Sequence, residues 1–302
     1  MSSGRLVVIV GPTASGKTDL SIRLAEHYRA PILSTDSRQI YRGMPIGTAQ
    51  PDAGQLRRVE HHFIASLDIT REFSCGQFET EALALLGRLF AEHETVIAAG
   101  GSGLYVRALC EGMDDLPEAD AALRAALAER LRREGLPALV EELGRLDPDY
   151  CDRVDRDNPA RVLRALEVCL QTGRPFSAYR TGVRRKRDFG IVKLGVDLPR
   201  EVLYERIDRR VDLMMEAGLE AEARALYPFR RLNALQTVGY KELFAYFDGT
   251  CTREEAVALI KRNTRRYAKR QLTWFRRDGE IRWFAPDRTE EMISCIDLAF
   301  RK

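Results

Sequence analysis

Residues 6–18 read Leu6-Val-Val-Ile-Val-Gly-Pro-Thr-Ala-Ser-Gly-Lys-Thr18. The first five are apolar and mostly β-branched, which predicts a buried strand. They lead directly into Gly11–Thr18, which fills the pattern G-x-x-x-x-G-K-[ST], and a helical pattern follows from Asp19 to Tyr28. In such a loop the backbone N–H groups converge on an anion, and the N-terminus of the next helix adds positive potential. The sequence therefore predicts a strand, a phosphate-binding loop and a helix, in that order.

Each residue of this loop is a candidate phosphate ligand. Lys17 would supply a mobile positive charge, and the Thr18 hydroxyl would hold Mg²⁺. The other members contribute backbone N–H groups or the turns that aim them: Gly11, Pro12, Thr13, Ala14, Ser15 and Gly16. The loop alone does not identify the phosphate compound that it binds.

Composition sets limits on the class of protein. The chain has 302 residues, of which 45% are hydrophobic, enough for one large domain or two ordinary ones. No stretch resembles a signal peptide or a membrane span, so we expect a cytoplasmic protein without a membrane partner. The six cysteines are scattered and show neither a C-x-x-C pair nor histidines at ligand spacing, which favours buried thiols over disulfides or a zinc site.

Three further strand patterns extend the sheet, and one carboxylate follows the second of its strands. Pro31–Thr35 and Thr95–Ala99 are buried-strand patterns, and Phe63–Ile64, after two histidines, is a third candidate. Because ligands bind at the carboxyl ends of parallel strands, Asp36 should face the phosphate loop. A carboxylate there would serve a cation or a proton transfer; the alternative is a turn acid or helix cap.

The strand pattern Thr95–Ala99 ends in Gly100-Gly-Ser-Gly103 and leads into a helix from Leu104 to Cys110. An ATPase would place a magnesium-binding acid at the end of such a strand. Glycine argues against an ordinary ATP hydrolase, and we expect the backbone here to approach a ligand closely.

The middle of the chain changes in character after Gly112. It contains helical patterns and no strand candidate until Ile191–Asp197, where the sheet resumes. Asn158 as an N-cap, Pro159 at the first helical position and Gly173 after the last turn bracket one of these helices. We predict an α/β fold, a P-loop NTPase-like doubly wound parallel sheet with a helical insertion domain. The core would comprise residues 1–112 and 189–302, and the insertion residues 113–188.

A basic segment near the end of the chain is the second strong signal. Residues 261–277 contain eight Lys or Arg residues and no acid, although the net charge of the whole chain is only +3. At about 100° per residue all eight fall in one half of a helix, while Ile260, Tyr267, Trp274 and Phe275 fall in the other. An unneutralised row of cations repels itself and favours a polyanion, so we expect nucleic acid on this face; a solvated basic face is the alternative.

Seven motifs together resemble the bacterial tRNA dimethylallyltransferases. The resemblance runs from end to end and departs from the family pattern at Pro45, Gln50, Ser102, Asp157-Asn158 and Ala160, outside the phosphate loop and Asp36. The motifs are Gly11–Thr18, Asp36–Met44, Ile46–Ala49, Gly100–Tyr105, Arg164–Val168, Gly239–Lys241 and Tyr267–Arg276.

This resemblance implies transfer of a dimethylallyl group from dimethylallyl diphosphate to N6 of the adenine 3′-adjacent to the anticodon. It assigns the diphosphate to Gly11–Thr18, to the Thr13 hydroxyl and to Arg210. Because adenine N6 is a weak nucleophile, stabilising the leaving diphosphate is the main electrostatic task, shared by the N–H groups of residues 13–18, Lys17 and Mg²⁺ on Thr18. Asp36 would accept the N6 proton.

The resemblance also implies contacts with tRNA, and the extruded target adenine would be gripped from two sides. Surface salt bridges are the alternative for the arginines. The residues implied are Asp36, Ser37, Arg38, Gln39, Ser102, Arg124, Ala160, Arg161, Val162, Leu163, Arg164, Gly239, Tyr240 and Lys241, and the basic segment adds Lys261, Arg265, Arg266, Lys269 and Arg270.

Three other functions remain open at this stage. A phosphate-loop kinase for a small molecule or nucleotide would need ATP and has little use for the basic segment. A nucleotide-driven RNA-binding switch would need switch chemistry that the sequence lacks. Prenyl transfer to free adenine nucleotide would have no use for the helical insertion.

For the oligomeric state, we expect a monomer.

Overall fold

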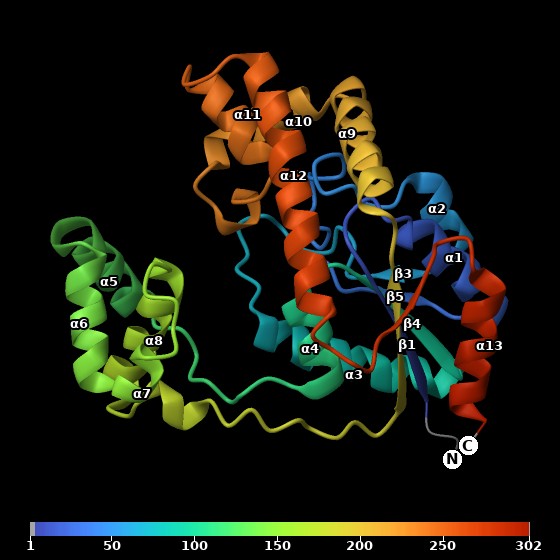
Figure 1. Ribbon diagram of the computed structural model, residues 1–302, viewed down its shortest axis with the longest axis horizontal. Helices are drawn as coiled ribbons and strands as arrows, with labels where there is room; N and C mark the ends of the chain where they lie inside the picture. Colours follow the sequence, from blue (N-terminus) through green and yellow to red (C-terminus); the bar gives the residue numbers. More distant parts are fainter. Residues whose placement is uncertain (1–3, 302) are drawn as a thin grey trace. The chain divides into compact units, whose positions relative to one another are not determined.

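The computed structural model describes residues 4–301, within which six strands form one parallel sheet (Figure 1). The sheet order is β3-β2-β4-β1-β5-β6. In the centre, Leu6 of β1 pairs with Val96 on one side and Ile191 on the other. The strands are β1 (Arg5–Val10), β2 (Ile32–Ser34), β3 (His61–His62), β4 (Thr95–Gly100), β5 (Gly190–Val196) and β6 (Arg282–Phe284).

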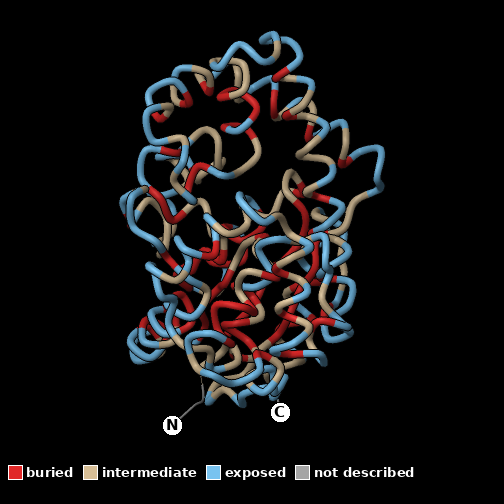
Figure 2. Tube along the Cα trace, turned by 90° about the vertical axis from the view of Figure 1, so that its left-hand side faces the viewer, coloured by how far each residue is buried: buried red, intermediate tan, exposed pale blue. Residues whose placement is uncertain are grey.

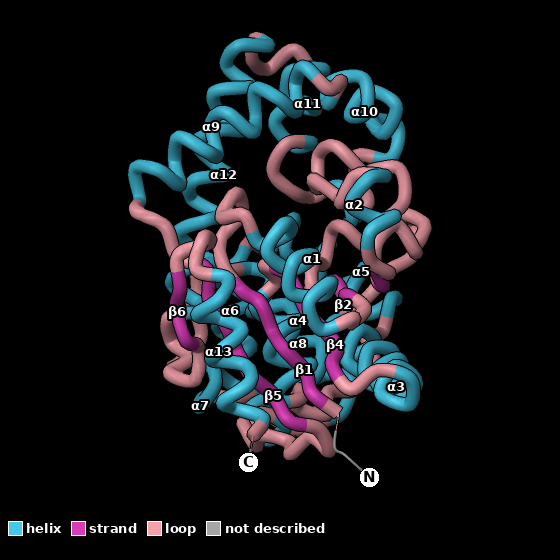
Figure 3. Tube along the Cα trace, turned by 90° about the vertical axis from the view of Figure 1, so that its right-hand side faces the viewer, coloured by secondary structure: helices cyan, strands magenta, loops and turns pink. Residues whose placement is uncertain are grey.

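Helices pack on both faces of this sheet, as Figure 3 shows. Val7 and Ile9 pack in one core cluster with residues of α1 and α13. Leu6 and Val8 point the other way, into a cluster with α3 and α4. Figure 2 shows the buried residues gathered toward the inside of the chain trace and the exposed ones around its outside. The helices of this part are α1 (Lys17–Tyr28), α2 (Ala53–Arg58), α3 (Cys75–Glu92), α4 (Gly103–Glu111), α9 (Arg200–Glu216), α10 (Leu219–Leu226), α11 (Tyr240–Phe247), α12 (Arg253–Phe275) and α13 (Thr289–Phe300), with the 3₁₀ turns η2 (Tyr227–Phe229) and η3 (Asn233–Leu235).

The topology confirms the predicted α/β fold with a doubly wound parallel sheet. After β1 the chain moves to β2 and β3 on one side, returns to β4, and then continues on the other side with β5 and β6. The phosphate loop therefore leaves the sheet at the point where the winding reverses, which is where such sheets bind ligands.

The chain divides into two compact units, one formed by residues up to Glu111 and from Lys186 onward, the other by Gly112–Arg185. The second unit is helical and has its own core, which includes Leu139, Leu143, Val162 and Leu166. Its elements are α5 (Ala121–Glu134), α6 (Leu136–Leu146), α7 (Pro148–Cys151), α8 (Pro159–Thr172) and the 3₁₀ turn η1 (Phe176–Tyr179). The α8 bounds agree with the caps expected from sequence: Asn158 accepts a hydrogen bond from the Arg161 N–H, and Gly173 has a φ of 66°.

One strand expectation was wrong, and several elements had no local signal. The edge strand is His61–His62 itself, because Phe63 has a φ of 60° and turns the chain away from the sheet. No sequence pattern described above predicts α10, α11, β6 or α13. None of the helices within residues 4–301 combines the length and apolar composition that crossing a membrane requires.

Candidate active site

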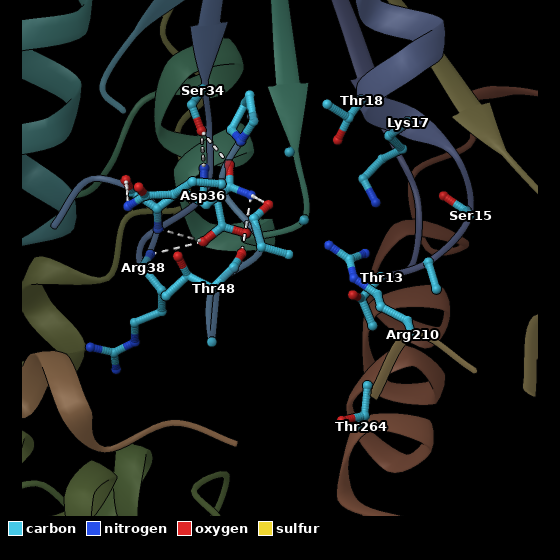
Figure 4. Close-up of a pocket in the computed structure, with 18 of the residues that line it drawn as sticks. Thr13, Ser15, Lys17, Thr18, Ser34, Asp36, Arg38, Thr48, Arg210 and Thr264 are labelled. Carbon is cyan, nitrogen blue, oxygen red and sulfur yellow. Dashed lines mark hydrogen bonds between the residues drawn. The ribbon is translucent and has the colours of Figure 1, made fainter. Parts of the chain in front are cut away.

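The phosphate loop and the segment after β2 line one cavity of about 510 Å³ in the sheet-containing unit. Its walls come from the carboxyl ends of β1, β2 and β4, completed by α9 and α12. Thr13, Lys17, Thr18, Asp36 and Arg210 all line it. Figure 4 shows the loop residues and Arg210 on one side and Asp36 on the other. The structure thus brings together the five residues for which the sequence analysis expected roles in the chemistry.

Two partly buried cations face this cavity from different elements. Lys17 begins α1, and its Nζ donates to the Pro12 carbonyl at 2.5 Å. Burial, and to a smaller extent the neighbouring Arg210, lower the pKa of Lys17 to about 7, although Asp36 opposes the shift. Arg210 comes from α9, and burial likewise lowers its pKa. Two desolvated cations repel each other and create a site that an anion would stabilise.

The loop does not offer all the amides expected from its sequence. The Thr13 N–H donates to Oε1 of Gln271, 258 residues away, at 2.9 Å. The Ser15 N–H donates to the Pro12 carbonyl at 3.3 Å. Both amides are therefore engaged within the protein, which corrects the expectation that the N–H groups of residues 13–18 all point at the anion. The Thr13 side chain still lines the cavity.

Asp36 uses one carboxylate oxygen to hold its own loop. Oδ1 accepts hydrogen bonds from the N–H groups of Arg38, at 2.8 Å, and Gln39, at 3.3 Å. This is the turn arrangement that aspartate side chains commonly make. Among the described residues, none donates a hydrogen bond to Oδ2. The turn role and a proton-accepting role are therefore compatible, because each uses a different oxygen.

The glycine-rich segment at the end of β4 lines the cavity at Gly100 and Gly101, and it also approaches other parts of the chain closely. A Cβ on Gly100 would lie 2.6 Å from the backbone carbon of Thr35, and one on Gly101 would lie 2.2 Å from Nε2 of Gln271. Between them and α4, Ser102 Oγ accepts a hydrogen bond from the Ser37 N–H at 2.9 Å. Ser102 therefore joins this segment to the Asp36 loop.

Two neighbours of Asp36 that the sequence associates with tRNA also stabilise the cavity wall. Arg38 donates to the Asn233 carbonyl at 2.6 Å, and Gln39 donates to the Ala49 carbonyl at 2.8 Å. Gly239 lines the cavity, whereas Lys241 is exposed at the start of α11. Arg38, Gln39 and Lys241 are at least partly accessible, and Gly239 is buried but lines the cavity, so all four stay candidates for contacts with a ligand.

Tyr240 is a correction to the sequence expectation. Its side chain is fully buried, so it cannot contact a macromolecule directly. Its hydroxyl donates to Glu222 at 2.6 Å, and the same carboxylate accepts the N–H groups of Ile46 and Gly47 at 2.9 and 2.8 Å. Tyr240 and Glu222 therefore hold the Ile46–Ala49 motif against α10 and α11.

We expect Tyr240→Phe to lower the free energy of unfolding by about 1–3 kcal/mol, because the buried Glu222 hydrogen bond is lost. The tRNA affinity should change little. Urea unfolding measures the first effect, and Tyr246→Phe on the same helix is the matched control. An unchanged free energy of unfolding together with weakened tRNA binding would show that Tyr240 acts in tRNA recognition.

In the helical unit, the predicted tRNA contacts separate into anchored and exposed residues. Glu167, only 2% exposed, pairs with Arg124 at 3.1 Å and with Arg164 at 3.0 Å. Val162 is fully buried and Leu163 packs on the same core, so the expectation that the Val162 side chain contacts tRNA was wrong. Ala160 and Arg161 are exposed at the start of α8 and stay candidates.

The basic segment occupies the second half of α12, and acids elsewhere in the fold neutralise part of it. Lys261 pairs with Asp212 at 2.6 Å and Arg265 pairs with Asp208, both acids being on α9. Arg276, just past the helix, pairs with Asp197 at 2.8 Å. Three members of the row are therefore neutralised, whereas the sequence suggested a row of cations without neutralising partners. Within residues 4–301, five members form no ion pair and four of them are exposed on the helix: Arg262, Arg266, Lys269 and Arg270, with Arg277 beyond its end.

The apolar half of the same helix also differs from expectation. Ile260 and Phe275 are buried as predicted, but Trp274 is 36% exposed and Tyr267 lines the cavity. Burial and the charge of Asp36 raise the pKa of Tyr267. Sequence reasoning missed three residues of this neighbourhood, namely Glu222, Tyr267 and Gln271. A polar glutamine on the apolar side of α12 was the available signal for the last of them.

Comparison with known proteins gives a consistent result. The sequence profile of the family described as IPP transferase matches residues 39–278. A tRNA dimethylallyltransferase 1 from Phocaeicola vulgatus is 49% identical over 96% of this chain and 97% of its own length. A tRNA isopentenylpyrophosphate transferase from Bacillus halodurans, solved as a crystal structure, is 38% identical, with a TM-score of 0.71 over 97% of this chain and 95% of that one. A eukaryotic dimethylallyltransferase acting on tRNA is 25% identical, with a TM-score of 0.84 over 98% of this chain and 79% of that one.

Proposed function

Because the chain belongs to the IPP transferase family, we propose that it transfers a dimethylallyl group from dimethylallyl diphosphate to N6 of the adenine 3′-adjacent to the anticodon of tRNA, releasing diphosphate. One observation carries the proposal. A single cavity has two partly buried cations and a phosphate loop on one side, and on the other side a carboxylate of which one oxygen accepts no hydrogen bond from the described residues. The first side suits a leaving diphosphate, and the second suits the nucleophile that replaces it.

The reaction needs one bond to break and another to form at C1 of the donor. The C1–O bond breaks with its electron pair going to diphosphate, and the N6 lone pair of adenine forms the new C1–N bond. Lys17, Arg210 and the Thr13 hydroxyl would stabilise the charge that develops on the departing oxygens. Asp36 Oδ2 would accept the proton that N6 loses as the bond forms. Oδ1 would keep the carboxylate in place through its two backbone hydrogen bonds.

Magnesium is the metal that this site would take. The Thr18 side chain lines the cavity beside Lys17, and the described residues hold no cluster of three acidic, histidine or cysteine side chains. Mg²⁺ retains several waters and binds substrate phosphates, so one hydroxyl together with diphosphate oxygens and water is a suitable ligand set. When bound, the ion would neutralise part of the diphosphate charge.

For tRNA, we propose contacts with the accessible residues near the cavity, on α11, in the helical unit and on α12, and with Gly239, which is buried but lines the cavity. The accessible residues are Asp36, Ser37, Arg38, Gln39 and Ser102 near the cavity, Lys241 on α11, Ala160, Arg161 and the half-exposed Arg124 in the helical unit, and the exposed basic residues of α12. We propose that the helical unit, residues 113–188 in the sequence analysis, grips the tRNA together with the core. We also propose that the protein acts as a monomer and in the cytoplasm, where tRNA is its substrate.

Incubation with radiolabelled dimethylallyl diphosphate and Mg²⁺ tests the proposal. We expect label in bulk tRNA and none in AMP, whereas prenyl transfer to AMP alone would favour the free-nucleotide reaction. If tRNA stimulates consumption of ATP and no prenyl group is transferred, the kinase hypothesis is favoured. Label that enters tRNA away from the adenine next to the anticodon would contradict the proposed position.

Neutralising the unpaired basic residues should weaken tRNA binding through phosphate contacts. For the double change Arg266→Gln and Arg270→Gln we expect the slope of log affinity against log salt to fall by about one unit per lost contact. Filter binding over a range of salt concentrations measures this slope. Arg288→Gln, which removes an exposed charge from the start of α13, is the control. Equal slopes for the unchanged protein, the double variant and Arg288→Gln would show that the basic face contacts solvent and not tRNA.

A further inference from the structure

Gln271 is a buried polar residue that connects α12 to two loops of the cavity. Only 6% of it is exposed, although it lies on a helix whose neighbouring residues Lys269 and Arg270 face solvent. Its Oε1 accepts the Thr13 N–H at 2.9 Å, and its Nε2 donates to the Gly101 carbonyl at 3.0 Å. Both ends of the amide are therefore used, one on the phosphate loop and one on the segment after β4.

The surroundings of Gln271 leave little room for another residue. A Cβ on Gly101 would lie 2.2 Å from Nε2 of Gln271, so glycine is what allows the amide to reach the carbonyl. Three residues further along α12, the Trp274 ring takes the space that a side chain at Gly103 would occupy. A carboxamide accepts from one loop and donates to the other at the same time, whereas a carboxylate would place its second oxygen against a carbonyl oxygen.

This arrangement has a consequence for Thr13. Engaging its N–H with Gln271 fixes the backbone of the loop residue whose hydroxyl faces the cavity. Ala14, the next residue, has a φ of 63°, an unusual conformation for a residue with a Cβ. Such conformations persist only where the surroundings hold them, and Gln271 supplies a hydrogen bond immediately before it.

We propose that Gln271 is a positioning residue for the phosphate loop: it holds Thr13 so that its hydroxyl meets the diphosphate, and it ties this loop to the helix that carries the exposed basic residues. The inference rests on the proposed function, because it concerns donor binding in that reaction. Gln271 itself would not touch the donor.

The change Gln271→Met keeps a similar volume and removes both hydrogen bonds. We expect the KM for dimethylallyl diphosphate to rise about 10-fold, since two neutral hydrogen bonds are lost and the loop gains freedom. The affinity for tRNA should stay near that of the unchanged protein, whereas the thermal unfolding temperature should fall, because the Thr13 N–H and the Gly101 carbonyl lose their partner. Thr273→Val, on the exposed side of the same helix, is the matched control and should leave the donor KM as it was.

A double-mutant cycle with Thr13→Ala separates positioning from a general structural effect. If Gln271 acts through the Thr13 hydroxyl, Gln271→Met should change the donor KM less than about 3-fold once that hydroxyl is absent. Equal effects in both backgrounds would overturn the proposal. If Gln271→Met fails to fold, Gly101→Ala, which displaces the same amide while retaining it, should raise the donor KM similarly; a normal KM there would also overturn the proposal. Absence of prenyl transfer by the unchanged protein would instead defeat the proposed function.

Discussion

Replacing Lys17 with methionine is expected to weaken the binding of dimethylallyl diphosphate about 10- to 100-fold, because one charge-assisted hydrogen bond to the diphosphate is lost. The same change should slow transfer about 10²- to 10³-fold, since charge on the leaving oxygens grows in the transition state. Equilibrium binding of the donor and single-turnover transfer at saturating tRNA measure the two effects separately.

The pH dependence of donor binding gives this prediction a second readout. In the free protein the pKa of Lys17 is about 7, so near neutral pH the amine is only partly protonated. A bound anion raises that pKa, and the complex therefore takes up a proton. Affinity is then greatest below about pH 7 and falls as pH rises, by up to tenfold per unit, until the raised pKa of the complex is passed.

Calorimetry in buffers of different ionisation enthalpy, with inorganic diphosphate as the probe, measures this proton uptake directly. Diphosphate has its own ionisations, so the informative quantity is the difference between the unchanged protein and Lys17→Met. Arg210→Met gives the opposite test: Arg210 lowers the pKa of Lys17, so its removal should leave the amine more protonated before binding and should reduce the proton uptake. Identical proton uptake with and without Lys17 would show that the amine is charged before the donor arrives.

These residues also show how far sequence reasoning reaches. Lys17 and Thr18 are found within one short motif, and its strand and helix are local patterns that the fold preserves. Asp36 follows a buried strand, so the geometry of parallel sheets places it near the loop. Periodicity and caps were sufficient for α8, whose N-cap and final glycine both lie within a few residues of the helix.

Contacts between distant segments were beyond that reasoning. The partner of the Thr13 N–H lies 258 residues away, and no local sequence pattern predicts this contact. The charge pattern of α12 gave the direction of its basic face but not the acids that meet it, because Asp208 and Asp212 belong to α9. The glycines after β4 were informative about close approach, yet the sequence could not say that Thr35 and Gln271 fill the space.

The exchange Asp36→Asn should lower kcat about 10²- to 10⁴-fold while leaving donor affinity close to normal. Asparagine has nearly the same shape, and its side-chain oxygen can still accept from the Arg38 and Gln39 N–H groups, so the loop should hold. What is lost is the carboxylate oxygen that would take the N6 proton. Asp36→Ala would remove the turn as well, and we expect it to lower stability in addition to rate.

Asp36 also contributes negative charge beside Lys17 and Arg210, so Asp36→Asn affects donor binding as well as turnover, to different extents. It opposes the lowering of the Lys17 pKa, so its neutralisation should lower that pKa and weaken donor binding slightly at neutral pH. The turnover loss should far exceed this change. Single-turnover rates at saturating donor and tRNA isolate the chemical step from any weaker hold on the adenine. A near-normal single-turnover rate in Asp36→Asn would assign Asp36 to the turn and to recognition, and would require another group to accept the N6 proton.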